Sequence, residues 1–92
     1  MPKKDLEEYK DLIIDNLETL RINLENYENL GLEDFDESVY NEITSLIDET
    51  KSVDEVLGLE EIVVQGKTIE TRLDSWLANQ GLSNLELVWP KI

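Results

Sequence analysis

An apolar residue returns at every third or fourth position through the first thirty residues of the chain. The recurring residues are Leu6, Tyr9, Ile13, Leu17, Leu20, Leu24 and Tyr27. Because an α-helix turns once in 3.6 residues, this spacing places them along one face of a long amphipathic helix. Asp5 and Glu8 form a capping box that would start this helix, and Gly31 is the left-handed terminator expected at its end.

A second helix is predicted to begin near Asp34 or Asp36, where acidic side chains suit the N-terminal end of the helix dipole. Its apolar face would consist of Val39, Ile43, Leu46 and Ile47. A second capping box spans Ser52 to Glu55, and Gly58 follows as a helix breaker. A third helix of only one or two turns is therefore expected there.

The last third of the chain changes character. The β-branched run at residues 62–64 is followed by Gln65 and Gly66, which is typical of a strand and a turn. A fourth helix is expected from Thr68, as its cap, to the Asn79-Gln80-Gly81 segment. Residues 85–89 alternate like a strand that Pro90 ends, and they could pair with residues 61–65.

These elements predict a single α+β, mostly helical domain over residues 1–92. It would contain two long antiparallel amphipathic helices, a short helix, a fourth helix and a small two-stranded ribbon. Because a two-stranded ribbon is marginal alone, it would have to lie on the helices. The alternative is an all-α bundle with an extended tail.

Composition narrows the possible functions. The chain has 22 acidic and 8 basic residues, a net charge of −14, and no histidine or cysteine. It therefore lacks the commonest general base, the commonest nucleophile and the soft-metal ligands, so a non-enzymatic protein without cofactor or metal is expected. Direct binding to nucleic acid or to an anionic membrane is disfavoured. The absence of cysteine and of an apolar leader or spanning segment favours a cytoplasmic location.

Acidic residues are concentrated on one line of the first helix, opposite its apolar face. These residues are Glu7, Asp11, Asp15, Glu18 and Glu25, and a second cluster follows at Asp34, Asp36 and Glu37. A solvated helix face would look the same. However, Lys10 and Arg21 are the only bases in this stretch of the helix, and acids four residues apart repel one another. We therefore expect these residues to bind a basic surface on another protein, such as a nucleic-acid-binding protein or a nuclease.

Mimicry of nucleic acid is a special case of this hypothesis. Five carboxylates over roughly 27 Å of helix give about one charge per 5 Å, whereas duplex DNA carries about one per 1.7 Å. A mimic would need a second row of acids beside the first. The second row could come from the cluster at Glu33, Asp34, Asp36 and Glu37 together with Glu42, Asp48 and Glu49, if the second helix packs alongside the first.

Other interpretations have less support in the sequence. Residues 63–68 resemble the end of a phosphate-binding loop, but Glu61 stands where its first glycine belongs. The pattern Asp34, Asp36, Ser38 and Glu42 resembles part of a calcium loop, but Val39 occupies its sharp turn and Ser45 the place of its closing acid. A structural role remains the alternative, with the long N-terminal helix assembling a homodimer. Trp89 either anchors the tail or contacts a partner.

Overall fold

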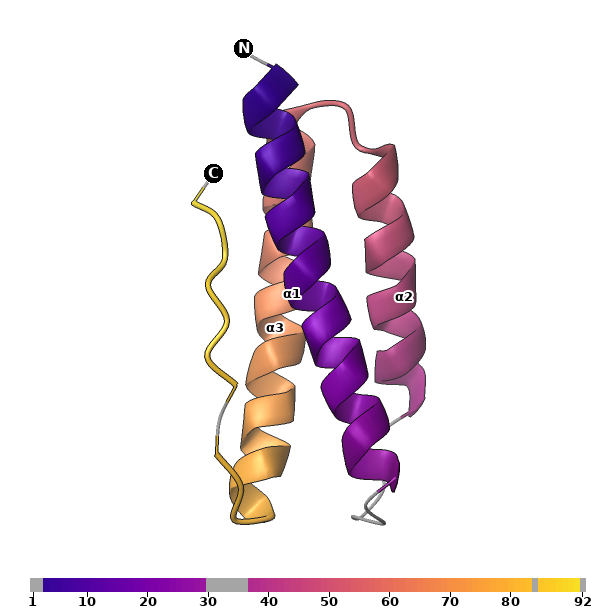
Figure 1. Cartoon of the computed structure of the whole chain (residues 1–92), viewed down its shortest axis with the longest axis vertical. Coiled ribbons are helices and arrows are strands. Elements are labelled where there is room, and N and C mark those ends of the chain that lie inside the picture. The colour runs from indigo at the N-terminus through magenta and orange to yellow at the C-terminus, as the bar shows by residue number, and fades with distance from the viewer. Residues whose placement is uncertain (1–2, 30–36, 84, 92) are drawn as a thin grey trace.

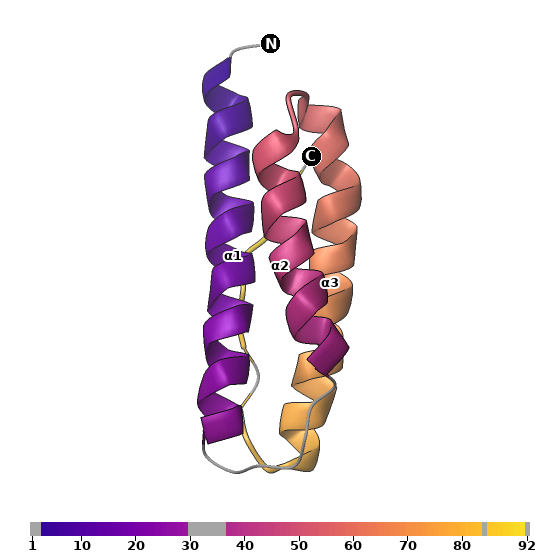
Figure 2. The same ribbon diagram turned by 90° about the vertical axis from the view of Figure 1, so that its right-hand side faces the viewer.

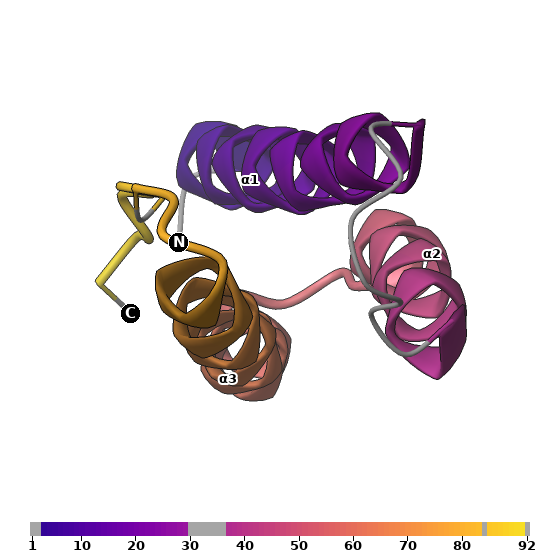
Figure 3. The same ribbon diagram turned by 90° about the horizontal axis from the view of Figure 1, so that it is seen from below.

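Three helices form the body of the protein in the computed structural model, which describes residues 3–29, 37–83 and 85–91. They are α1 (Lys3–Asn29), α2 (Glu37–Ser52) and α3 (Val56–Asn79). α1 and α3 run in the same direction and α2 runs opposite to them (Figure 1). Seen along the long axis, the helices occupy the corners of a triangle (Figure 3), and the molecule measures 45 × 20 × 16 Å.

The predicted α+β class is wrong, because no strand occurs among the described residues. The fold is all-α, as in the alternative of a helical bundle with an extended tail. The predicted apolar face of the first helix is confirmed, since Ile13, Leu17 and Leu20 are fully buried. α1 begins at Lys3, so Asp5 lies in its first turn rather than at its cap. Gly31 lies outside the described residues.

The core is shared by all three helices. α2 contributes the four residues predicted for it, Val39, Ile43, Leu46 and Ile47, together with the buried Thr50. The Thr50 hydroxyl donates a hydrogen bond to the Leu46 carbonyl at 2.6 Å, so this polar group is satisfied inside the core. α3 contributes Leu59, Ile62, Val63, Ile69, Leu73 and Leu77.

The predicted strand at residues 62–64 and the predicted turn at Gly66 are wrong, because both lie inside α3. Ile62 and Val63 are 1% and 5% exposed. Burying each side chain stabilises the fold by roughly 1.5–3 kcal/mol, whereas a β-branched residue in a helix costs only a few tenths. Ile62 and Val63 can be buried only if residues 62–64 are helical, because the core residues of α3 before and after them repeat at helical spacing.

The predicted short third helix is also wrong. Ser52 ends α2, and Glu55 is the N-cap residue of α3. The predicted third and fourth helices are thus one helix, in which Gly58 and Thr68 are interior residues. The ammonium of Lys10 on α1 holds the connection between α2 and α3: it donates to the Lys51 carbonyl at 3.0 Å and to the Val53 carbonyl at 2.7 Å. The Lys51 carbonyl belongs to the last turn of α2 and the Val53 carbonyl follows it, so both lie at the end of the helix where a positive charge is favourable.

Lys10→Met is expected to lower the free energy of unfolding by about 1–2 kcal/mol, since methionine keeps the stem and loses two charge-assisted hydrogen bonds. Urea denaturation measures this change. Lys51→Met is the matched control, because Lys51 is an exposed lysine in the last turn of α2; it should change stability by less than about 0.5 kcal/mol. Equal effects of the two substitutions would contradict the bridging role of Lys10.

α3 ends as predicted, at Asn79, Gln80 and Gly81. Gly81 has a φ of +76°, its N–H donates to the Ala78 carbonyl at 3.1 Å, and the Leu82 N–H donates to the Leu77 carbonyl at 2.9 Å. This pair of bonds is a Schellman motif, in which glycine takes the left-handed conformation at little cost. The chain then reverses, and the tail (residues 85–91) runs back beside α3 and α1 on the side away from α2 (Figures 1 and 3).

Side chains of the helices hold the tail in place. Glu70 accepts hydrogen bonds from the Leu87 N–H at 3.1 Å and from Trp89 Nε1 at 2.9 Å. Asp74 accepts one from the Leu85 N–H at 3.0 Å, and Asn16 on α1 donates one to the Val88 carbonyl at 2.7 Å. The predicted strand pairing of the tail is therefore wrong, because its backbone binds side chains instead of residues 61–65. Trp89 anchors the tail.

Gly66 provides the surface on which Trp89 packs. A Cβ atom at Gly66 would lie 2.5 Å and 2.7 Å from two atoms of the indole ring. Glycine inside a helix costs about 1 kcal/mol relative to alanine. Here it lets the ring lie against the α3 backbone, so this glycine is part of a packing contact rather than a helix end.

Candidate functional site

The outward side of α1 carries the predicted row of acids. Glu7, Asp11, Asp15 and Glu25 are exposed and Glu18 is half-buried. On an ideal helix the five positions fall within about 80° of arc. We call these five residues the acidic face. Their exposure follows from the helix phase, since the buried residues of α1 occupy the opposite side.

Four members of the acidic face have no partner within the described part of the chain. Glu7, Asp11, Asp15 and Glu18 accept no side-chain hydrogen bond and form no ion pair there. Glu25 differs, because its Oε1 accepts a hydrogen bond from the Tyr40 hydroxyl of α2 at 2.8 Å. Like charges at this spacing repel one another by a few tenths of a kcal/mol for each pair. The row therefore costs stability that no described contact offsets.

The second predicted cluster cannot be placed in the same way. Glu33, Asp34 and Asp36 lie outside the described residues. Glu37 is the first residue of α2, and its side chain is not among those described.

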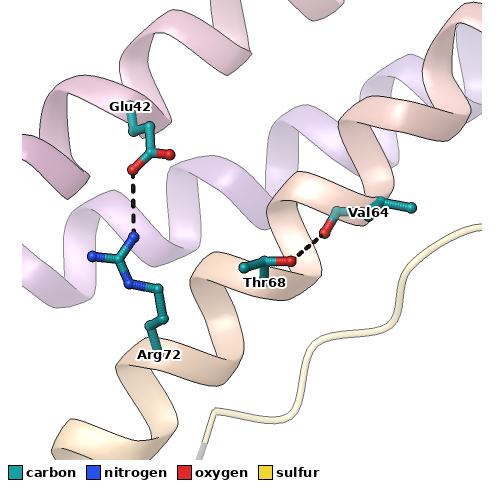
Figure 4. Close-up of polar contacts among 4 residues, drawn as sticks. All are labelled: Glu42, Val64, Thr68 and Arg72. Carbon is teal, nitrogen blue, oxygen red and sulfur yellow. Dashed lines mark hydrogen bonds and ion pairs between the residues drawn. The ribbon is translucent and has the colours of Figure 1, made fainter.

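The acids of α2 do not form a row beside the acidic face. Glu42 forms an ion pair with Arg72 of α3 at 3.6 Å, so its side chain lies on the flank of α2 that faces α3 (Figure 4). Glu49, seven residues on, shares that flank. The opposite flank carries Tyr40, which reaches Glu25 of α1. Figure 2 shows α2 in front, with α1 on one side of it and α3 on the other, so its two flanks face different helices.

Two partly apolar side chains accompany the acidic face, and neither was predicted from the sequence. Ile22 is 51% exposed and lies between Glu18 and Glu25 on α1, and Tyr40 is 36% exposed. Ile22 does not lie on the apolar face of α1. Its position in the helical repeat was therefore enough to predict that it is exposed. No comparable signal links Tyr40 to Glu25, because they belong to different helices.

The apolar seam of α1 is occupied within the chain. Ile13, Leu17 and Leu20 have no exposed surface, and they belong to one core cluster with residues of α2 and α3. A homodimer would therefore need a surface other than this seam. In the described residues every helix is too polar or too short to cross a bilayer.

The two segments that resemble a phosphate-binding loop and a calcium loop contain helical residues in the structure. Residues 63–68 are helical, so they make no loop that could surround a phosphate. Ser38 and Glu42 of the calcium-like pattern lie in α2. No group of three or more potential metal ligands comes together in the part of the chain that the structure describes. Glu70 and Asp74 are occupied by the tail.

The chain matches no protein-family model, no curated protein and no solved structure. A function must therefore be inferred from the residues of this chain alone. Among them the acidic face stands out, because five acids share one side of α1 and four of them have no partner among the described residues.

Proposed function

We propose that this protein is a non-enzymatic interaction module whose acidic face binds a basic surface of another protein. The partner class that fits best is a nucleic-acid-binding protein or a nuclease, which the module would inhibit or regulate. One observation carries the proposal: Glu7, Asp11, Asp15 and Glu18 share one side of α1 and have no ion pair or hydrogen bond among the described residues.

The physical reason is a balance between stability and binding. A row of unpaired acids opposes folding, but it attracts a basic partner over a distance of about 8–10 Å at physiological ionic strength. Such attraction raises the association rate and favours partners of opposite charge. Ile22 and Tyr40 add apolar contact area beside the charges, and isoleucine and tyrosine side chains bury well in an interface.

A general basic surface suits this face better than the role of a duplex mimic. The charge density of α1 alone is roughly a third of that of DNA. The second row that a mimic needs is not supported by Glu42, which pairs with Arg72 on the other flank of α2.

The test reverses charges on the acidic face. Asp11→Lys with Asp15→Lys is compared with Asp48→Lys with Glu49→Lys, which changes the net charge equally but alters exposed acids of α2. Each variant and the native chain are used to capture proteins from the source cells. The affinity of a purified partner is then measured by calorimetry. The α1 variant should bind at least tenfold more weakly, and the α2 variant should stay within about threefold of the native affinity.

Salt and stability complete the test. Native affinity should fall steadily as salt is raised from about 50 mM to about 500 mM, because the interaction is electrostatic. The α1 variant should be at least as stable as the native chain, since it removes repulsion between neighbouring acids. Binding that is unchanged by salt, or that is equally sensitive to both double variants, would refute the proposal.

A further inference from the structure

The outward side of α3 has a different character from that of α1. Leu57 and Val64 are 75% and 58% exposed, the former being among the most exposed large apolar side chains described. Thr68, Thr71 and Ser75 continue the same line and are also exposed. On an ideal helix these five residues fall within about 60° of arc and extend over roughly 27 Å. We call them the neutral face.

The threonines of this face are less polar than their residue type suggests. The Thr68 hydroxyl donates to the Val64 carbonyl at 2.9 Å (Figure 4), and the Thr71 hydroxyl donates to the Lys67 carbonyl at 3.0 Å. Both hydroxyl protons are thus used within the helix. The methyl group of each threonine is then the part of the side chain that can contact another surface. Thr68 and Thr71 lie on the same line of α3 as Leu57 and Val64.

The charges beside this face come close to balance, although the protein carries −14 overall: Glu60, Glu61 and the α2 residue Glu42 stand against Lys67 and Arg72. The exposed charged residues of α3 are two acids, Glu60 and Glu61, followed by two bases, Lys67 and Arg72. Arg72 pairs with Glu42 at 3.6 Å, and its side chain is still 46% exposed. Acids therefore precede bases along the helix. Two such helices in antiparallel arrangement would place the acids of each against the bases of the other.

We propose that a second copy of this chain docks on the neutral face, with α3 packed antiparallel against α3. A two-fold dimer requires a surface that is complementary to itself, and the order of charges along α3 meets this requirement. Two molecules of the same high charge repel one another least where each surface is neutral. A basic partner, by contrast, is drawn to the acidic face, so this proposal does not depend on the proposed function.

The dimer should be weak. One helix packed on one helix buries less than the roughly 1,200 Å² of a standard stable interface. Overall repulsion between the copies opposes association, and salt screens that repulsion. Dimerisation should therefore strengthen as salt increases. This is the opposite of the salt dependence of the proposed basic partner, so failure of one proposal can be distinguished from failure of the other.

Sedimentation equilibrium of the full chain, from about 10 µM to about 1 mM at low and high salt, tests the dimer. The native chain should form a dimer whose dissociation constant falls severalfold at high salt. Val64→Asp should weaken association at least tenfold. The matched control is Ile22→Asp, which introduces an acid at a similarly exposed apolar residue of α1 and should leave the dimer intact. A native chain that stays monomeric, or equal effects of the two variants, would overturn the proposal.

A charge exchange provides the second variant. Lys67→Glu leaves three acids and one base on the exposed side of α3 and should weaken the dimer at least severalfold. Adding Glu60→Lys restores the balance and again sets a base of one copy against an acid of the other, because positions 60 and 67 share one flank of α3, so it should recover most of the association. Both positions are exposed, and circular dichroism verifies that each variant keeps its helices. If Lys67→Glu has no effect, or if the exchange does not recover association, the charge pattern does not determine the contact.

Discussion

Trp89→Ala is expected to lower the free energy of unfolding by about 3 kcal/mol. Truncating a buried Phe or Trp typically costs about 3–5 kcal/mol, and Trp89 is half-buried, so its packing alone falls below that range. The substitution also removes the hydrogen bond from Nε1 to Glu70 and leaves a groove over Gly66. Since small domains are stable by about 5–15 kcal/mol, this loss is large.

Urea denaturation followed by circular dichroism gives the measurement. Val88→Ala is the neighbouring control, because the Val88 side chain is 75% exposed and cannot form a hydrogen bond. Its effect should stay below about 0.5 kcal/mol. Trp89→Phe should lie between the two, with a loss of about 1 kcal/mol or slightly more, since it keeps most of the ring contact and loses the hydrogen bond. A Trp89→Ala effect as small as that of Val88→Ala would mean that the tail is not docked on the helices.

Gly66→Ala is expected to destabilise the native chain but to stabilise the variant that lacks the Trp89 ring. In the native chain it should destabilise the protein by about 1–2 kcal/mol. The new methyl group would fall less than 3 Å from the indole of Trp89, so the ring must move and its bond to Glu70 must lengthen. In the Trp89→Ala background the ring is gone, and the same substitution should stabilise the protein by about 0.5–1 kcal/mol through helix propensity.

The double-mutant cycle isolates the contact. A coupling energy of about 2 kcal/mol between positions 66 and 89 is expected, which lies within the range found for residues in direct contact. The four proteins can be compared by denaturation under one set of conditions. Additive effects would show that Gly66 and Trp89 do not touch.

Local periodicity was enough to predict α1 and α2. Leu17, Val39 and Ile43 are buried because their positions repeat with the helical turn, which any window of the sequence reveals. The same method failed for α3, since Gly66 and the β-branched run at residues 62–64 are local signals for a strand and a turn. The deciding contribution is the burial of Ile62 and Val63 in the core shared by the three helices, and Trp89, which is distant in the sequence, makes a contact that fills the space above Gly66. Local propensity cannot include that contact.

Some features of the candidate site could likewise be predicted from the sequence, and others could not. Exposure of Asp11 and Asp15 follows from the phase of one helix and was predictable. The bond between Tyr40 and Glu25 and the ion pair between Arg72 and Glu42 depend on how helices are rotated against one another. A single sequence does not encode that rotation in any local pattern. The neutral face could be recognised only after residues 62–79 were known to be helical.

The order of events during protein synthesis follows from the position of the tail. α1 and α2 contact each other and can associate as an antiparallel hairpin while α3 is still being made. The side of α3 around Gly66 stays open until residue 89 has left the ribosome. Trp89 then covers that side of α3, and a protease that removed residues 85–91 would expose it again. Residues 85–91 thus complete the packing of helices that are translated before them.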